Sequence, residues 1–361
     1  MYKQPSLKNP LLKDHKIQLK PSVDPPKMMV SGRNNSHKFA VEQAWRRSGS
    51  CPEGSIPIRR TPASANATIA NQTLPFFSLY GRPAPTNITI QDEASVEGNY
   101  SVEIAAAYAV NGPYHGARAS IPVWKVEVQP FEFSKSYLLV ASPKERDFIP
   151  IRGKDPPDIN NQIALGLAVY PQYFGDGLPR LYLYSTNDGG VKSKCFNLEC
   201  SFVQTSNKVA LGALCDHFST IGGTLYSLPV GIYRDAGPAV MWVSVQEEPI
   251  GYFHESAFTP PFIESFHNEM GGHVLDRRAD GKHTLTPMGS GMYPSDGLHN
   301  AACISYYLGI AYTGADQVDD PVNTIVTHPK CYDVKDYGPD LYHPGTDVAF
   351  GGPGGYDCDA N

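Results

Sequence analysis

The stretch Leu181-Tyr-Leu-Tyr-Ser-Thr-Asn-Asp-Gly-Gly190 combines a strand pattern with a turn signal. Leu181 and Leu183 alternate with Tyr182 and Tyr184, as in a strand whose side chains point to two faces in turn. Asn187-Asp-Gly-Gly190 follows at once, and Asn, Asp and Gly tolerate the left-handed backbone that tight turns need. This stretch therefore predicts a β-strand that ends in a tight turn.

The same combination recurs along the chain. Apolar residues alternate with polar ones over 124–129, Ser101–Ala107 has strand character, and the apolar run Val240–Val245 predicts a central strand. The 361 residues include 33 Gly and 32 Pro, too many for a helix-rich protein but suited to short strands and turns. The sequence predicts an all-β fold, an antiparallel sandwich of two packed sheets. Short helices are expected at Pro10–Leu19, His37–Arg47 and Phe262–Met270.

Charge divides the chain. The first 60 residues carry 12 basic and 4 acidic side chains, a net charge of +8, and the remainder has a net charge of −14. A solvated leader would explain this, but a basic pro-segment that lies against an acidic body is the favoured interpretation. The expected division is a pro-segment at 1–62, a linker at 63–112 and the main domain at 113–361. The acidic body argues against a nucleic-acid partner.

Two segments resemble those that carry the catalytic glutamates of plant neprosin-type glutamic peptidases. They are Gln162–Asp176, with the sequence QIALGLAVYPQYFGD, and Met270-Gly-Gly-His-Val274. Asn9–Ser22 and Cys51–Thr61 are similar to the activation segment of that family. Further matches follow in the same order along the chain: Tyr114–Trp124, Asn187–Gly190, Cys195–Cys200, His283–Gly291 and Phe350–Gly355. The resemblance implies two antiparallel sheets with a long cleft across one face, and a proline-directed endopeptidase that acts at acid pH.

Both glutamates are absent, because Ala164 and His273 occupy their positions. In glutamic peptidases one acidic or amide side chain activates a water, and its partner protonates or stabilises the tetrahedral intermediate. Ala164 exchanges no proton. His273, with a reference pKa of about 6.5, is expected to be largely charged at acid pH and a poor base. The chain is therefore expected to be catalytically impaired and to bind an extended peptide or a cell-wall polymer in its cleft.

Two alternatives remain open: an active endopeptidase that pairs a substitute carboxylate, Glu269 or Asp176, with His273, and a relic that folds poorly. Gly271-Gly272 makes the direction of Glu269 unpredictable, and the favoured interpretation is a surface glutamate. The resemblance places tryptophans at Leu167, Met270 and Ser185, so recognition of proline is in doubt. The expected cleft framework consists of Gly166, Leu167, Asp176, Met270, Gly271 and Gly272.

The chain has seven cysteines, and six cysteines already allow 15 pairings. The resemblance implies the disulfides Cys195–Cys200 and Cys331–Cys358. Cys51 would leave with the pro-segment, and Cys215 and Cys303 either pair or remain buried thiols.

A secreted glycoprotein is expected, because N-x-[ST] sequons occur at Asn34, Asn66, Asn71, Asn87 and Asn99. The N-terminus Met1-Tyr-Lys-Gln-Pro-Ser6 has no apolar signal-peptide core, so we expect this version of the sequence to lack one. No run of 18 apolar residues predicts a membrane span. His267, His273 and His283 do not follow the H-E-x-x-H spacing, and neither a metal nor a cofactor is expected.

Overall fold

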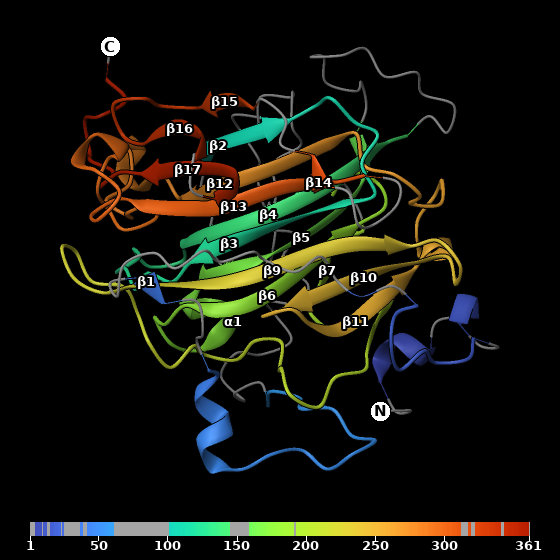
Figure 1. The fold of residues 1–361 in the computed structure, drawn as a ribbon. Coiled ribbons are helices and arrows are strands. Elements are labelled where there is room, and N and C mark those ends of the chain that lie inside the picture. The colour runs from blue at the N-terminus through green and yellow to red at the C-terminus, as the bar shows by residue number, and fades with distance from the viewer. Residues whose placement is uncertain are drawn as a thin grey trace.

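The fold is a sandwich of two sheets, antiparallel in every strand pair except β1–β9. The computed structural model describes residues 4–8, 10–12, 15–22, 24, 37–38, 42–60, 101–144, 159–190, 193–311, 317–318, 322–340 and 343–360. In Figure 1 the two sheets lie one in front of the other, with the C-terminal strands at one end and the N-terminal segment at the other. This architecture confirms the predicted antiparallel sandwich.

The first sheet has ten strands and the second has seven. In sheet order the first contains β16 (Asp333–Asp340), β17 (His343–Gly351), β13 (Ala302–Ile310), β3 (Gly116–Pro122), β9 (Leu225–Asp235), β10 (Val240–Val245), β11 (Glu248–His254) and β8 (Phe202–Gln204), with β1 (His37–Lys38) beside β9 and β14 (Gln317–Val318) beside β13. The second contains β15 (Asn323–Val326), β2 (Ser101–Ala109), β12 (His267–Asp276), β4 (Phe133–Pro143), β5 (Ile159–Val169), β6 (Arg180–Thr186) and β7 (Cys195–Phe196).

Helices in the described residues are single turns. They are η1 (Pro5–Lys8), η2 (Pro10–Leu12), η3 (Ala44–Ser48), α1 (Pro171–Phe174), η4 (Glu255–Ala257), η5 (Ala279–Gly281) and η6 (Pro294–Asp296). None of the described helices is long and apolar enough to cross a membrane.

The core between the sheets follows the two-residue period of the strands. On β5, Ile163, Leu165 and Leu167 pack into this core, whereas Ala164 and Ala168 belong to a separate apolar cluster on the other face of the sheet. We call that other face, turned away from the ten-stranded sheet, the outer face of the seven-stranded sheet. The alternation decides which side chains can reach a ligand there.

Predictions for individual elements had mixed outcomes. The strands at 101–107, 181–186 and 240–245 are confirmed. The strand at 124–129 is wrong, because β3 ends at Pro122, which offers no N–H for a ladder. The helix Phe262–Met270 is also wrong. Its second half is β12, which is hydrogen-bonded on both sides, to β2 and β4.

The N-terminal elements also differ from expectation. Pro10–Leu19 contains only the 3-10 turn η2, and His37–Arg47 contains the short strand β1 and the start of η3. The expected linker 63–112 includes β2, which pairs with β12 and β15, so the sandwich begins before residue 113. The five sequons lie outside the described residues.

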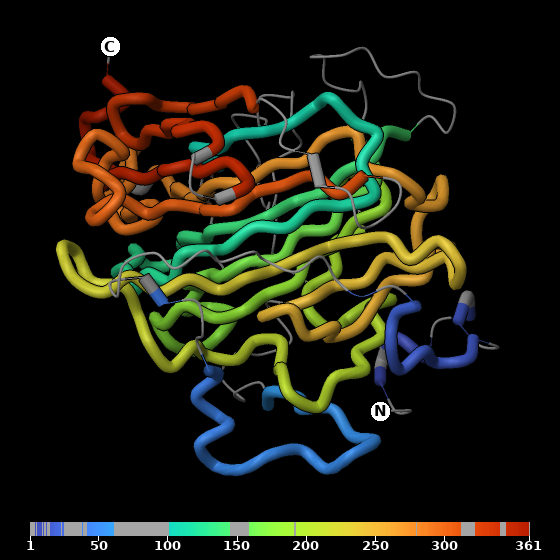
Figure 2. The backbone as a smooth tube through the Cα atoms, in the orientation of Figure 1, coloured from blue at the N-terminus to red at the C-terminus, as the bar shows by residue number. Residues whose placement is uncertain are grey.

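The N-terminal segment packs on the outer face of the ten-stranded sheet. Leu12 is buried with Trp242 and Tyr252 in one apolar cluster. The Gln4 side chain donates to the Gln204 carbonyl at 2.7 Å and accepts from its N–H at 2.8 Å. Figure 2 shows the blue N-terminal tube along this side of the sandwich.

Residues 42–60 continue the contact along the loop before β9. The Gln43 side chain makes two hydrogen bonds with the Ala210 backbone, at 2.9 and 2.7 Å. Among the described residues one ion pair joins the segment to the body, Arg47–Asp216 at 3.4 Å, and the Arg47 side chain is 65% exposed. The described contact therefore depends on apolar and amide groups more than on opposite charge.

Candidate active site

Ala164 and His273 lie on the same face of the same sheet. Ala164 is on β5 and His273 on β12, and β4 runs between these strands. Both side chains point to the outer face of the seven-stranded sheet, where Tyr137 on β4 lies between them. The two residue positions that the sequence singled out are therefore brought to one surface of the sheet.

The register places Glu269, not His273, directly across from Ala164. Leu139 of β4 pairs with Ala164 on one side and with Glu269 on the other. On this face, His273 lies four residues further along β12 than Glu269. There Lys135 of β4 pairs with His273 on one side and with Ala168 on the other. Two strand spacings of about 4.8 Å separate Ala164 from Glu269 in this row.

Glu269 is the centre of a buried hydrogen-bonded cluster. Its Oε1 accepts from the Tyr137 hydroxyl, and its Oε2 is 3.1 Å from His267 Nε2. The Tyr137 hydroxyl also lies 2.8 Å from His273 Nε2, which is 3.7 Å from Glu269 Oε1. We call Lys135, Tyr137, His267, Glu269 and His273 the Glu269 cluster. The favoured sequence interpretation, a surface glutamate, is wrong.

Burial and mutual charge set the protonation states of the cluster. Burial alone would raise the pKa of Glu269, but its hydrogen bond with His267 and the nearby His273 hold the pKa far below its usual range. Burial and the neighbouring Lys135 lower the pKa of His273 to about 4, although Glu269 opposes this change. Burial likewise lowers the pKa of Lys135 well below its usual value. His273 is therefore neutral above about pH 4, which corrects the expectation of a charged imidazole throughout the acid range.

Ala164 itself lies in an apolar row. Its partners on the neighbouring strands are Leu139 and Tyr184, and none of the three is more than 5% exposed. A methyl group in this place supplies neither a base nor a hydrogen-bond donor. The Glu269 cluster brings together one ionised carboxylate, two imidazoles, one phenol and the Lys135 amine.

Comparison with known proteins identifies the chain. The family model described as Neprosin matches residues 132–353, and the model described as Neprosin activation peptide matches residues 1–94. The chain belongs to the neprosin family.

The solved structures that match this chain are distant from it in sequence. Scytalido-glutamic peptidase, bound to a peptide-based transition-state analogue, is 11% identical over 71% of this chain and 98% of that chain, with a TM-score of 0.34. SCP-B, a member of the eqolisin family of peptidases in complex with the tripeptide Ala-Ile-His, is 10% identical over 71% and 98%, with a TM-score of 0.32.

The framework residues of this neprosin domain divide between the two faces. Gly166 and Gly271 flank Tyr137 in its row, so no side chain intervenes between its ring and either neighbouring strand. Leu167 and Met270 instead pack in the core between the sheets, and a Cβ on Gly272 would meet Phe350 and Met288 there. The expectation that Leu167 and Met270 line the cleft is wrong, because side chains three apart on β5 and on β12 face opposite ways.

Asp176 is removed from the Glu269 cluster. It follows α1 and Gly175, whose φ of 79° is left-handed, and its carboxylate binds the Arg180 guanidinium at 3.0 and 2.5 Å. Burial would raise its pKa, but the hydrogen bonds and charge of Arg180 lower the pKa overall. Asp176 therefore holds the loop between α1 and β6 through Arg180. It is not part of the cluster that contains His273.

The cysteines follow the pairing that the resemblance to neprosins implied. Cys195–Cys200 and Cys331–Cys358 are disulfides. Cys51, Cys215 and Cys303 are free. Burial and the nearby Asp216 raise the pKa of the Cys215 thiol to about 12, so this thiol is unreactive. Of the two alternatives for Cys215 and Cys303, the structure has separate thiols.

The three histidines considered as metal ligands do not meet in one place. His267 and His273 belong to the Glu269 cluster, whereas His283 lies beside Glu103 and Asp276. Sequence reasoning missed Lys135 and Tyr137 entirely. The sequence feature that could have identified them is their spacing of two residues in Lys135, Tyr137 and Leu139, which places all three on one face of a strand.

Proposed function

We propose that this neprosin-family protein is impaired in two-carboxylate peptide hydrolysis and acts by binding an extended peptide or a cell-wall polymer at the outer face of the seven-stranded sheet. One observation carries the proposal: Ala164 faces this surface with a methyl group, and the carboxylate across from it, Glu269, is committed to Tyr137 and His267. The two disulfides support a secreted location.

Loss of proton transfer explains the expected inactivity. Each positioned acid or base contributes about 10²–10⁴-fold to a hydrolytic rate. Ala164 contributes neither, and a carboxylate whose pKa is held as low as that of Glu269 is a weak base. The outer face carries Tyr137, Tyr182 and Tyr184, whose rings and hydroxyls are of the kind that contact peptides and sugars. All three side chains are buried in the described structure, so binding requires that they first become accessible.

A second candidate is an active endopeptidase that uses Glu269 with His273. It is favoured by one contact, the 3.7 Å between Glu269 Oε1 and His273 Nε2, with the Tyr137 hydroxyl in contact with both. This alternative requires that ligand binding release Glu269 from His267 and raise its pKa toward the acid range.

Digestion of proline-containing peptides at acid pH, followed by mass spectrometry, separates the two candidates. We expect no cleavage by the natural protein freed of its pro-segment and measurable cleavage by the double variant Ala164→Glu/His273→Glu. Cleavage by the natural protein that disappears in Glu269→Gln would overturn the proposal in favour of the second candidate. Circular dichroism of each variant checks that it is folded.

A further inference from the structure

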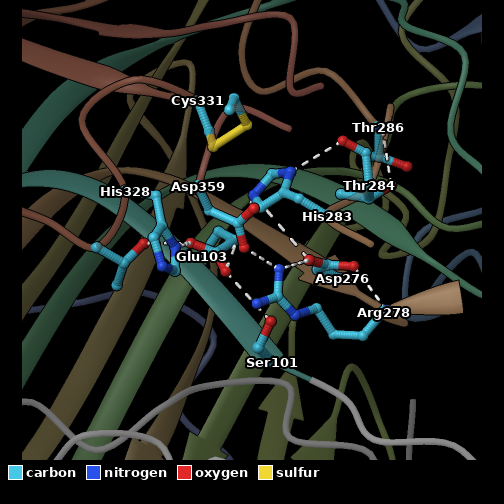
Figure 3. Close-up of polar contacts among 12 residues, drawn as sticks. Ser101, Glu103, Asp276, Arg278, His283, Thr284, Thr286, His328, Cys331 and Asp359 are labelled. Carbon is cyan, nitrogen blue, oxygen red and sulfur yellow. Dashed lines mark hydrogen bonds and ion pairs between the residues drawn. A yellow bond between two sulfur atoms is a disulfide. The ribbon is translucent and has the colours of Figure 1, made fainter. Parts of the chain in front are cut away.

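A second group of buried polar side chains lies at one end of the sandwich. It is on the face of the seven-stranded sheet opposite the one that carries the Glu269 cluster. Glu103 is on β2 and Asp276 is the last residue of β12; His283 and His328 come from the loops that follow β12 and β15. Ligand atoms of Glu103, His283 and His328 lie within 4.8 Å of one another. Figure 3 shows these side chains around the Arg278 guanidinium and the Asp359 carboxylate, which pair with each other. Their place is distinct from the Glu269 cluster.

The tautomer of His283 is fixed by its neighbour. His283 Nδ1 is 3.0 Å from the carbonyl oxygen of Thr284. A carbonyl only accepts, so Nδ1 carries the hydrogen and a neutral ring presents a lone pair at Nε2. This Nε2 atom belongs to a wholly buried side chain and has no hydrogen-bond partner.

The lone pair of His283 faces two carboxylates. Nε2 is 4.0 Å from Glu103 Oε1 and 4.0 Å from Asp276 Oδ2. These separations are too long for hydrogen bonds. Two metal–ligand bonds of about 2.0–2.1 Å at a tetrahedral angle place their ligand atoms about 3.3 Å apart, so an inward shift of less than about 1 Å would close these side chains on one cation. The Arg278 guanidinium lies 3.5 Å from Asp276 Oδ2 and balances part of this negative charge, but His283 Nε2 itself has no donor.

The carboxylates are held in place by neighbouring donors. Thr327 Oγ1 donates to Glu103 Oε2 at 2.5 Å, and the backbone N–H of Arg278 donates to Asp276 Oδ1 at 2.7 Å. Such outer contacts orient metal ligands and fix which oxygen is presented. The oxygens near His283 Nε2 are Glu103 Oε1 and Asp276 Oδ2. Each has one further, longer contact: Ser101 Oγ donates to Glu103 Oε1 at 3.2 Å, and the Arg278 guanidinium donates to Asp276 Oδ2 at 3.5 Å.

His328 provides both a fourth donor and an entry path. Its Nδ1 lies 2.6 Å from Glu103 Oε2 and donates to it, because an ionised carboxylate only accepts, so a neutral ring would bind the metal through Nε2. The side chain is 38% exposed. Cys331 and Cys358 also lie next to His283, but they are joined in a disulfide and offer no thiolate. The donor set is therefore two imidazoles and two carboxylates, which suits Zn²⁺ among the common divalent metals.

We propose that Glu103, Asp276, His283 and His328 form a binding site for one divalent transition metal ion, with zinc as the occupant. The site is structural: it joins β2, the end of β12 and the loop that leads into the Cys331–Cys358 disulfide. It replaces the sequence-based expectation that the chain binds no metal. It does not depend on the proposed function, because none of the four residues faces the Glu269 cluster.

Metal analysis of the full chain tests the proposal. After chelator treatment, dialysis and addition of zinc, we expect about one zinc per chain by mass spectrometry of the metal. His283→Gln should lose this zinc, whereas His299→Gln, which removes an exposed imidazole, should keep it. Thr327→Val removes the hydroxyl that donates to Glu103 and accepts from the Ile104 N–H, and it should weaken zinc binding by about 10–100-fold.

Two further readouts keep the test decisive if His283→Gln does not fold. Zinc at about 100-fold its dissociation constant should raise the Tm of the natural protein by several degrees, and X-ray absorption should show nitrogen and oxygen ligands without sulfur. Absence of zinc, sulfur ligation, or zinc binding that is unchanged in folded His283→Gln would overturn the proposal. The first of these results would assign the buried charge to a protonated His283 instead.

Discussion

Tyr137 is the residue on which the Glu269 cluster depends most directly. Its hydroxyl contacts both Glu269 and His273 in a region that is almost fully buried. Tyr137→Phe leaves the ring and removes the hydroxyl, so a buried carboxylate loses a donor, which costs about 1–3 kcal/mol. We expect urea denaturation to show this loss in the free energy of unfolding. Tyr356→Phe, at a half-exposed tyrosine, is the matched control, and equal stability of the two variants would contradict the assignment.

His273 makes the stability of the protein depend on pH. Its pKa is about 4 in the folded protein and about 6.5 when unfolded, so the unfolded chain binds more protons between these values. Stability therefore falls as the pH drops from about 6.5 to about 4, by about 3 kcal/mol for this group, and then levels off. His273 faces Lys135, Tyr137 and Glu269, and the low pKa of Glu269 acts mainly below about pH 4.5, outside most of this window.

Replacement of His273 removes that slope. We expect the unfolding free energies of the natural protein and of His273→Gln, measured by urea at steps between pH 7 and pH 4, to converge as the pH falls. His299→Gln should follow the natural protein at a constant offset. Parallel curves for His273→Gln would show that His273 titrates normally.

Single residues were predictable where the strand period was recognised and unpredictable elsewhere. Ala164 and His273 were identified by sequence, and the structure places both on one face. For Glu269 the sequence favours a surface position, and Gly271-Gly272 leaves the direction of its side chain unpredictable. The two glycines instead continue β12, so the period of two carries Glu269 and His273 to the same side.

At the scale of elements, β12 shows why local pattern misleads. Phe262, Phe266 and Met270 recur every four residues, as in a helix. The segment becomes a strand because β2 and β4 offer hydrogen bonds to both of its edges, which outweighs a weak local preference. Residues 124–129 are the reverse case: they alternate in exposure as a strand does, but the described residues give them no ladder partner.

The N-terminal segment is attached by apolar and amide groups more than by opposite charge. Leu12 is buried in the cluster with Trp242 and Tyr252, whereas Arg47 is largely exposed. Leu12→Ala should weaken the docking of the segment by about 2–5 kcal/mol, and Arg47→Ala by less than about 1 kcal/mol. Limited proteolysis of the full chain measures this as the rate of cleavage within residues 1–60.

Salt gives an independent check on the same element. Exposed charges are screened, so docking by opposite charge would loosen as salt rises. We expect the proteolysis rate of the natural protein to change little with salt. A strong salt dependence together with a mild effect of Leu12→Ala would restore the charge-based interpretation of the basic leader.

On the scale of the whole molecule, the two outer faces of the sandwich carry different groups. The described part of the N-terminal segment covers the outer face of the ten-stranded sheet, and the Glu269 cluster lies on the outer face of the other sheet. The fold class and both disulfides followed from strand patterns and from family resemblance. The division of faces did not, because it depends on which sheet each strand joins, and single-chain periodicity does not encode sheet order.

The two disulfides should contribute unequally to the stability of the molecule. Cys331–Cys358 closes a loop with a sequence separation of 27, and Cys195–Cys200 one with a separation of 5. Because a cross-link restricts the unfolded chain more when its loop is longer, Cys331→Ser/Cys358→Ser should cost about 3–4 kcal/mol and Cys195→Ser/Cys200→Ser about 2 kcal/mol. Urea denaturation of both double variants measures the difference. If the short loop proved the more costly, its role would be to hold β7 and Phe196 against Tyr182 in the native state, and the entropic argument would not apply.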